Sequence, residues 1–281
     1  PGEFEHFINW LSAAIGEKRP LQTVWIFSGT QGTGKGLFFN HILTPMIGES
    51  NVASKKLSAL EDNFNSFIGD KLFVALDEFH ITDSKQDQRT FDYIKYITGN
   101  DRIDVRAMYK ESLNIQTYCN YLFFSNHTDV ARLEDGDRRH NVGNPQPLKI
   151  TEAHPELFQE GFDLEQVLND EMPRLYAYLH HFNYDLLLAR TCLDNEAKRS
   201  MRVASMGVHQ KFCFALREGD LDYFVENMNG LSNTPMHLMS VKHVAEKVIT
   251  QWIDDAINGL PTDIALPEAH AVYQTLNPDS N

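Results

Sequence analysis

Residues 29–36 have the sequence Gly29-Thr30-Gln31-Gly32-Thr33-Gly34-Lys35-Gly36 and lie between an apolar run at 24–27 and a segment at 37–43 with helical apolar spacing. Strand, glycine-rich loop, lysine and helix is the context that a phosphate-binding P-loop requires. Its backbone N–H groups and the helix dipole attract phosphate, and Lys35 would reach the β- and γ-phosphates. The predicted nucleotide-binding residues are Gly29, Thr30, Gln31, Gly32, Thr33, Gly34, Lys35, Gly36 and Leu37.

One position of this loop departs from the P-loop pattern. The pattern has Ser or Thr after the lysine, whose hydroxyl binds Mg²⁺, whereas this chain has Gly36 followed by Leu37. We therefore expect Mg²⁺ to be held by phosphates, water and an acidic residue from elsewhere, as suits an ion that keeps several waters. The alternative for the whole stretch, a glycine-rich surface turn with a solvated lysine, fits its flanking segments less well.

The second informative stretch is 71–78, an apolar run that ends in Asp77 and Glu78. A run without alternation is typical of a parallel strand covered on both faces, and the carboxyl ends of such strands face the ligand. We predict that Asp77 binds Mg²⁺ and that Glu78 is the general base for the attacking water. A strand that merely ends in a solvated acidic turn is the alternative.

A third apolar strand is expected at 120–124, followed by Ser125 and Asn126. Level with the two acids, Asn126 could orient the attacking water or contact the γ-phosphate, although Asn is also an ordinary turn residue. Farther on, Arg138 and Arg139 follow an acidic segment. Either could enter a neighbouring subunit's site as an arginine finger, and a surface salt-bridge loop is the alternative.

Residues 102–115 alternate between apolar and polar side chains with an interruption near 109–111, which predicts a β-hairpin. Arg102, Arg106 and Lys110 could contact a phosphate backbone there. A plain solvated hairpin explains the pattern equally well.

Composition excludes some classes of protein. The chain has 281 residues, of which 42% are hydrophobic and 23% charged, as in ordinary globular proteins. A net charge of −14 argues against broad coating of nucleic acid, so any such contact must be local. No apolar run approaches membrane-spanning length, and the three cysteines form no C-x-x-C pair. We expect a soluble, intracellular protein without membrane contact.

The order and spacing of these motifs resemble those of superfamily-3 helicases over about 20–143. Lys35, Asp77-Glu78, the segment from 97 to Lys110, and Phe124-Ser125-Asn126 are similar to motifs A, B, B′ and C of that family. The segment 137–139 is similar to the arginine-finger region of phage and plasmid primase–helicases, and the whole pattern looks most like the helicase part of a phage primase–polymerase.

This resemblance implies an AAA+-type ring, expected to be a hexamer, that hydrolyses ATP with Mg²⁺ between subunits. The ring would move single-stranded DNA through its pore, where six hairpins would concentrate basic side chains. The resemblance also implies a covalently linked N-terminal primase or polymerase region outside this sequence, and the host-cell cytoplasm as the location if the protein is phage-encoded.

The expected fold class is α/β, a P-loop NTPase (AAA+-like) domain with a central, mainly parallel sheet, followed by an all-α C-terminal domain. We predict a bracing helix at 1–20, the ATPase domain at 21–146, a linker at Pro145-Gln146-Pro147, and a helical domain at 147–281. The apolar pattern at 164–179 suggests helices interrupted at Pro173, and the clearest helix is expected at 241–257.

The predicted function is that of an ATP-dependent DNA helicase or translocase module. One alternative is a small-molecule (nucleotide) kinase, since Gly-x-Gly-Lys-Gly also occurs in nucleoside monophosphate kinases. Those enzymes lack the Asp-Glu and Ser-Asn strand ends and carry arginine-rich lids that are not found here. A second alternative is a non-hydrolysing, DNA-binding structural subunit with a decayed P-loop, for which Gly36 is the only support.

Overall fold

The computed structural model describes residues 2–60, 65–80, 85–106, 111–127, 130, 133–134, 136–204, 206–228, 236–260 and 264–277, without the side chains of 85–88, 228, 237 and 240. The chain divides into two compact units, 1–205 and 206–281. Each unit has its own buried core.

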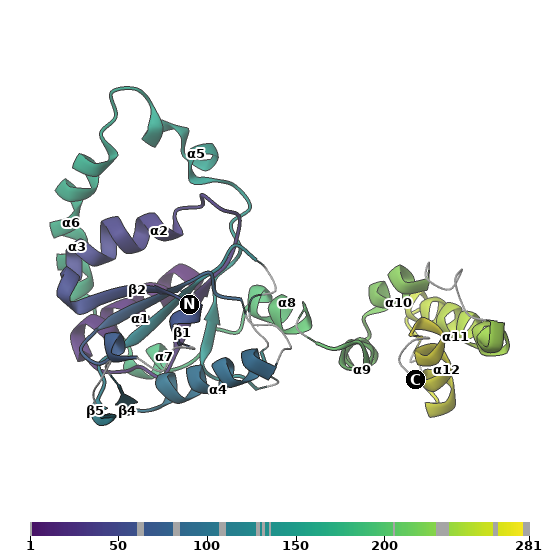
Figure 1. Cartoon of the computed structure of the whole chain (residues 1–281). Coiled ribbons are helices and arrows are strands. Elements are labelled where there is room, and N and C mark those ends of the chain that lie inside the picture. Colours follow the sequence, from purple (N-terminus) through teal and green to yellow (C-terminus); the bar gives the residue numbers. More distant parts are fainter. Residues whose placement is uncertain are drawn as a thin grey trace. The chain divides into compact units, whose positions relative to one another are not determined.

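The first unit is built on a parallel sheet of five strands in the order β2-β3-β6-β1-β7. Figure 1 shows this sheet with α4 (Lys85–Gly99) along one of its faces. The strands span, in spatial order, Val52–Lys56 (β2), Phe73–Asp77 (β3), Asn120–Phe124 (β6), Val24–Phe27 (β1) and His140–Val142 (β7). Because all five strands are parallel, their carboxyl ends lie together at one end of the sheet. The predicted α/β class with a mainly parallel sheet is confirmed.

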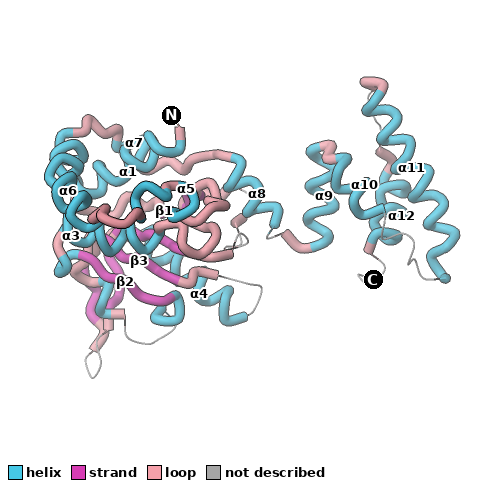
Figure 2. The backbone as a smooth tube through the Cα atoms, turned by 90° about the horizontal axis from the view of Figure 1, so that it is seen from above, coloured by secondary structure: helices cyan, strands magenta, loops and turns pink. Residues whose placement is uncertain are grey.

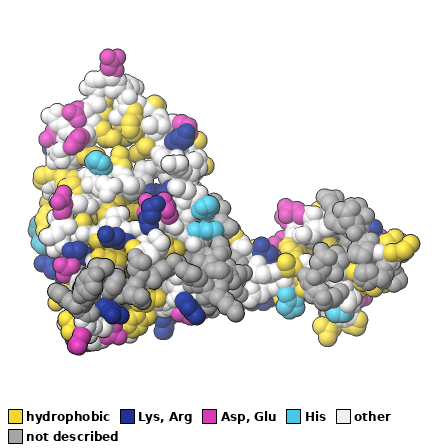
Figure 3. All heavy atoms as spheres, viewed as in Figure 1, with side chains coloured by type: hydrophobic (Ala, Val, Ile, Leu, Met, Phe, Trp, Pro, Cys, Tyr) yellow, Lys and Arg dark blue, Asp and Glu magenta, His cyan; other side chains and the backbone are white. Residues whose placement is uncertain are grey.

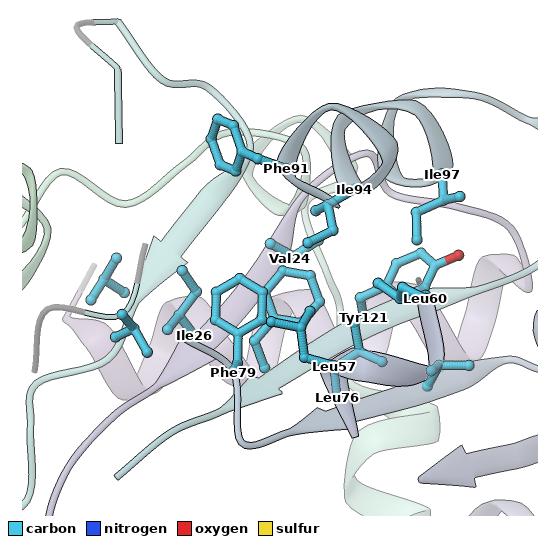
Figure 4. Packing of buried hydrophobic residues seen from close by; sticks show 14 of the residues in the cluster. Val24, Ile26, Leu57, Leu60, Leu76, Phe79, Phe91, Ile94, Ile97 and Tyr121 are labelled. Carbon is cyan, nitrogen blue, oxygen red and sulfur yellow. The ribbon is translucent and has the colours of Figure 1, made fainter. Parts of the chain in front are cut away.

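Helices cover both faces of this sheet. In β3, Val74 and Leu76 are buried on one face and Phe73 and Ala75 on the other, which is why the strand is apolar throughout. The first face packs against α4 (Lys85–Gly99), whose apolar side chains point at the strands (Figure 4). The α4 side chains in that cluster are Phe91, Ile94 and Ile97.

The opposite face packs against α1 (Glu3–Glu17), which is buried along most of its length. Trp10 is fully buried, and its indole Nε1 donates to the hydroxyl of Thr23 at 3.0 Å. That hydroxyl donates in turn to the carbonyl of Ala189, at 2.7 Å, in α7 (Leu186–Ala189). The expected bracing helix is therefore a core helix, held between the sheet and a helix from much later in the chain.

The boundary between the units lies after residue 205, whereas the sequence analysis placed it at 146/147. The physical reason is burial. Leu179 of α6 (Leu164–His181) is buried in the same cluster as α1. Met201 of α8 (Glu196–Ala204) is buried with α4 on the other face. Helix α6 also runs unbroken through Pro173, so the expected interruption there is wrong.

The shorter elements of the first unit connect these layers. They are α2 (Lys35–Leu37), the π-helical η1 (Phe38–Leu43), α3 (Thr44–Ile47), η2 (Glu49–Asn51), η3 (Leu57–Leu60), η4 (Ser66–Ile68), α5 (Ile150–Ala153) and η5 (Pro155–Phe158). A separate antiparallel pair, β4 (Arg102–Val105) and β5 (Leu113–Gln116), forms the predicted hairpin strands.

The second unit contains only helices among its described residues (Figure 2). These are α9 (Val208–Glu218), α10 (Leu221–Met228), η7 (Met236–Leu238), α11 (Met239–Ile257) and α12 (Leu266–Leu276). Their apolar faces meet in a core that includes Phe212, Phe224, Ile249, Trp252 and Val272. The expectation of a helical C-terminal part is confirmed. In the part of the chain that is described, no helix has the length and apolarity to span a bilayer.

Candidate nucleotide site

The glycine-rich loop packs against the segment that follows β7. Gly29 forms a parallel bridge with Gln146, and a Cβ at Gly29 would lie 2.9 Å from the backbone N and O of that residue. The φ of +141° at Gly29 also excludes most side chains. Farther along, the N–H of Ile150 donates to the carbonyl of Gly32 at 2.8 Å. Residues 145–147, which the sequence analysis expected to be a linker, therefore belong to a segment that packs against the glycine-rich loop.

Lys35 is held inside the loop by oxygen acceptors. Its ammonium donates to the carbonyls of Gly29 and Thr30, at 2.9 and 3.1 Å, and to the hydroxyl of Thr33 at 3.2 Å. Burial lowers the pKa of Lys35, and the nearby charge of Asp77 opposes that shift. The loop thus keeps a partly desolvated cation where successive backbone N–H groups can meet an anion.

A cavity of about 390 Å³ opens over this loop. Besides residues 31–37 of the loop, its lining includes Asp77 at the end of β3 and Asn126 just beyond β6. Lys35, Asp77 and Asn126, which are far apart in the sequence, therefore face one space. Their meeting follows from β6 lying between β1 and β3 in the sheet.

The same cavity has lining residues that the sequence analysis did not single out, namely Phe39, Asn40, Ser54, Ile150 and Phe158. Ser54 belongs to β2, an edge strand whose sequence contains no apolar run that would predict it. Phe158 belongs to a short helix beyond the wrongly expected linker. No local signal identifies Ser54, Ile150 or Phe158, because only the folded backbone brings them to the loop.

Glu78 is not part of the cavity lining, although it directly follows Asp77, which is. Its carboxylate forms an ion pair with Lys56 of β2 at 2.8 Å, and both side chains are more than half exposed. The hydrogen bond with Glu78 raises the pKa of Lys56. Exposed pairs of this kind stabilise a fold only slightly, so the pair can exchange for other contacts.

The backbone at Glu78 is left-handed, with φ of +55°. Such a conformation costs about 1–3 kcal/mol for a side-chain-bearing residue and is concentrated at functional sites. It persists here because the next residue is anchored. Phe79 is fully buried, stacks on Phe123 with ring centroids 4.3 Å apart, and donates its N–H to the carbonyl of Phe124 at 2.9 Å.

Arg138 and Arg139 lie at the amino ends of the strands, whereas the cavity lies at their carboxyl ends. They precede β7, and the carbonyl of Arg139 accepts the N–H of Val24 at the amino end of β1, at 2.8 Å. A Cβ at Gly99, at the end of α4, would lie 3.6 Å from the Arg139 guanidinium. Neither arginine lines the cavity of its own chain.

The segment before β7 is tied down by Asp137. Its carboxylate accepts from Nδ1 of His140 at 2.9 Å and pairs with the Lys198 ammonium of α8 at 3.1 Å. Burial opposes ionisation of this carboxyl, but the hydrogen bond and charge of His140, together with the charge of Lys198, hold the pKa of Asp137 well below its usual range. This network joins the arginine segment to α8.

We expect Asp137→Asn to lower the free energy of unfolding of this chain by about 3 kcal/mol, because it leaves the partly buried Lys198 charge without its carboxylate partner. The pKa of Asp137 is depressed, so its contribution is present above about pH 4 and is lost as the pH falls further. Urea denaturation at pH 7 and below pH 4 measures both effects. Asp194→Asn, which removes an exposed carboxylate paired with Arg199, is the control and should cost under about 1 kcal/mol.

The structure gives less information about the three basic hairpin residues that were predicted to contact DNA. The Arg102 guanidinium donates to the side-chain and backbone oxygens of Asn114, both at 2.8 Å. The backbone of Arg106 is held by the amide oxygen of Asn65 at 2.7 Å, and its side chain is exposed. Lys110 lies outside the described residues. On the visible face of the first unit, outside the grey regions, basic side chains are scattered among acidic and apolar ones (Figure 3).

The chain is similar to a protein of phage origin. Residues 27–139 match the family described as "Family of unknown function (DUF5906)". The chain is 27% identical, over 230 residues, to the DNA primase-polymerase of Nitratiruptor phage NrS-1, a match that covers 79% of this chain. It is therefore homologous to a part of that protein, and it spans 30% of that relative's length.

Solved structures of the apo C-terminal region of NrS-1 have the same fold. One superposes with a TM-score of 0.68 at 24% identity, covering 92% of this chain and 64% of that one. An A-form structure gives a TM-score of 0.70, also at 24% identity, covering 99% of this chain and 63% of the other. At this identity the likeness establishes the fold, including the sheet with its helical C-terminal part.

Proposed function

We propose that this chain is an ATP-hydrolysing DNA helicase or translocase module of a phage-type replication protein. The observation that carries the proposal is the single cavity shared by Lys35, Asp77 and Asn126. A cation in a glycine-rich loop, a carboxylate and an amide at neighbouring strand ends suit a bound nucleoside triphosphate.

In this proposal the loop amides and Lys35 bind the phosphates of ATP. Asn126 contacts the γ-phosphate or orients the attacking water, and Glu78 takes the proton from that water. Asp77, exposed at its strand end and facing the cavity, suits a hard cation that prefers oxygen ligands. When bound, Mg²⁺ would neutralise charge on the phosphates.

Self-assembly completes the proposed site. Arg138 and Arg139 lie at the other end of the strands from the cavity, so they can serve only a neighbouring subunit's nucleotide. A ring, expected to be a hexamer, would satisfy this requirement. It would also bring together six hairpins carrying Arg102, Arg106 and Lys110, which would bind single-stranded DNA with little sequence preference. Such concentration is needed in a chain of net charge −14.

The similarity to the NrS-1 protein supports a role in phage DNA replication. Because this chain matches only part of that primase-polymerase, we propose that a primase or polymerase region belongs to the same polypeptide. The helicase module would then open or move along the DNA that the attached region copies.

The direct test is ATP hydrolysis with and without single-stranded DNA. We expect turnover that single-stranded DNA stimulates, and Lys35→Ala should reduce it by about 100-fold or more because the phosphates lose a preorganised cation. Lys211→Ala, in the second unit, is the charge-matched control. Absence of turnover in the unaltered chain, with and without DNA, would refute the proposal.

The same assay separates the alternatives. A nucleotide kinase would transfer labelled phosphate to an acceptor nucleotide instead of releasing it to water. A non-hydrolysing structural subunit would bind single-stranded DNA while leaving ATP intact.

A further inference from the structure

The helix after the loop places a polar side chain, Asn40, within contact distance of a side chain at position 36. A Cβ built at Gly36 would have Nδ2 of Asn40 as its nearest neighbour, 4.0 Å away, outside the helix backbone and the adjacent residues. Asn40 is also part of the cavity lining, together with Lys35 and Asp77. Its terminal amide therefore lies beside the position from which a Ser or Thr at 36 would present its hydroxyl.

The helix after the loop explains how Asn40 reaches this position. The turn from Phe38 to Leu43 is π-helical, and the N–H of Thr44 bonds to the carbonyl of Phe39. Short π-helical turns of this kind are frequent at functional sites. Phe39 and Leu43 are buried against the sheet, which fixes the rotation of the turn, while Asn40 between them is exposed toward the cavity.

The Asn40 amide has the chemistry that Gly36 lacks. Its oxygen is a neutral, hard ligand of the kind that Mg²⁺ accepts. Either its oxygen or its nitrogen can face the cavity after a half-turn of the amide. Among the hydrogen bonds between described residues, none fixes the Asn40 amide. The same cavity lining includes Asp77.

We propose that the amide oxygen of Asn40 replaces the missing hydroxyl as a ligand of nucleotide-bound Mg²⁺, directly or through one ordered water. This inference rests on the proposed function, because it concerns the metal that accompanies ATP at the same cavity. It assigns to the helix after the loop a role that the residue at 36 cannot perform.

The test compares the Kd of a fluorescent ATP analogue in Mg²⁺ and in EDTA, for the unaltered chain and for variants. We expect the unaltered chain to bind more tightly with Mg²⁺, and Asn40→Ala to lose about tenfold of that gain, as for groups that support a metal site. Binding in EDTA should be unchanged, which also shows that the variant is folded. His41→Ala, on the same turn but outside the cavity lining, should behave as the unaltered chain.

A second change makes the result specific. Adding Gly36→Thr to Asn40→Ala restores a hydroxyl at the pattern's usual position and should recover the Mg²⁺ gain. If Asn40→Ala and the unaltered chain gain equally from Mg²⁺, the role of Asn40 is overturned. It is also overturned if the gain is lost only in Ser54→Ala, which changes another polar residue of the cavity lining. Those results would leave nucleotide binding intact. Failure of the unaltered chain to bind nucleotide in both buffers would instead overturn the proposed function, and this inference with it.

Discussion

Replacing Glu78 with Gln should slow ATP turnover by about 10²–10⁴-fold, because it removes the general base that accepts the proton of the attacking water. The Kd for ATP should change little, since Glu78 stands outside the cavity lining and Gln can adopt the same left-handed backbone. Single-turnover hydrolysis together with equilibrium nucleotide binding measures the two quantities separately.

The chain offers a matched control for this substitution. Glu134 is an exposed carboxylate paired with Lys95 at 2.7 Å, much as Glu78 is paired with Lys56 at 2.8 Å. Glu134→Gln removes the same charge and the same kind of ion pair at a distance from the cavity, so turnover should be unaffected. Hydrolysis at the normal rate in Glu78→Gln would show that another group activates the water.

Replacing both Arg138 and Arg139 with Ala should lower turnover by about 10³–10⁵-fold, the usual contribution of an arginine finger. The physical reason is that the transition-state charge on the transferred phosphoryl loses its external cation. ATP binding within one subunit should be retained, because these arginines lie at the other end of the strands from that subunit's cavity. Steady-state ATPase rates and nucleotide binding test both statements.

Mixing experiments decide whether the arginines act between subunits. A Lys35→Ala subunit keeps its arginines, and an arginine-less subunit keeps its loop, so some interfaces in a mixed ring contain an intact site. We expect mixtures to regain part of the activity that each variant lacks alone. Arg217→Ala, which changes an exposed side chain of α9 in the second unit, is the control and should need no rescue. If no ratio of the two subunits restores activity, a role in trans is wrong.

The central strands could be predicted from the sequence, but the edge strands could not. β1, β3 and β6 are buried on both faces, so their residues form continuous apolar runs. β2 contains Ser54 followed by two lysines, and β7 has three residues. β2 is exposed over most of its length, so its composition is not distinctive, and β7 is buried but too short to form an apolar run.

The helical part shows the same limit at larger scale. Apolar spacing predicted α11 and helical segments over α6, while the prolines at 145–147 led to a boundary there instead of after residue 205. Those prolines looked like a linker because they end regular structure locally. In the fold, their segment is held by contacts to Gly29 and Gly32, which the spacing of apolar residues cannot reveal.

The sequence by itself determined the glycine-rich turn, the lysine behind it, the acids that end one apolar run and the amide that ends another. These features follow from local backbone freedom and from burial patterns, which neighbouring residues set. Only the tertiary structure decided that Lys35, Asp77 and Asn126 share a cavity, that Asn40 joins Asp77 in its lining, and that Arg138 and Arg139 lie at the other end of the strands. Those relations depend on strand order and on packing between distant segments, which no short stretch of sequence encodes.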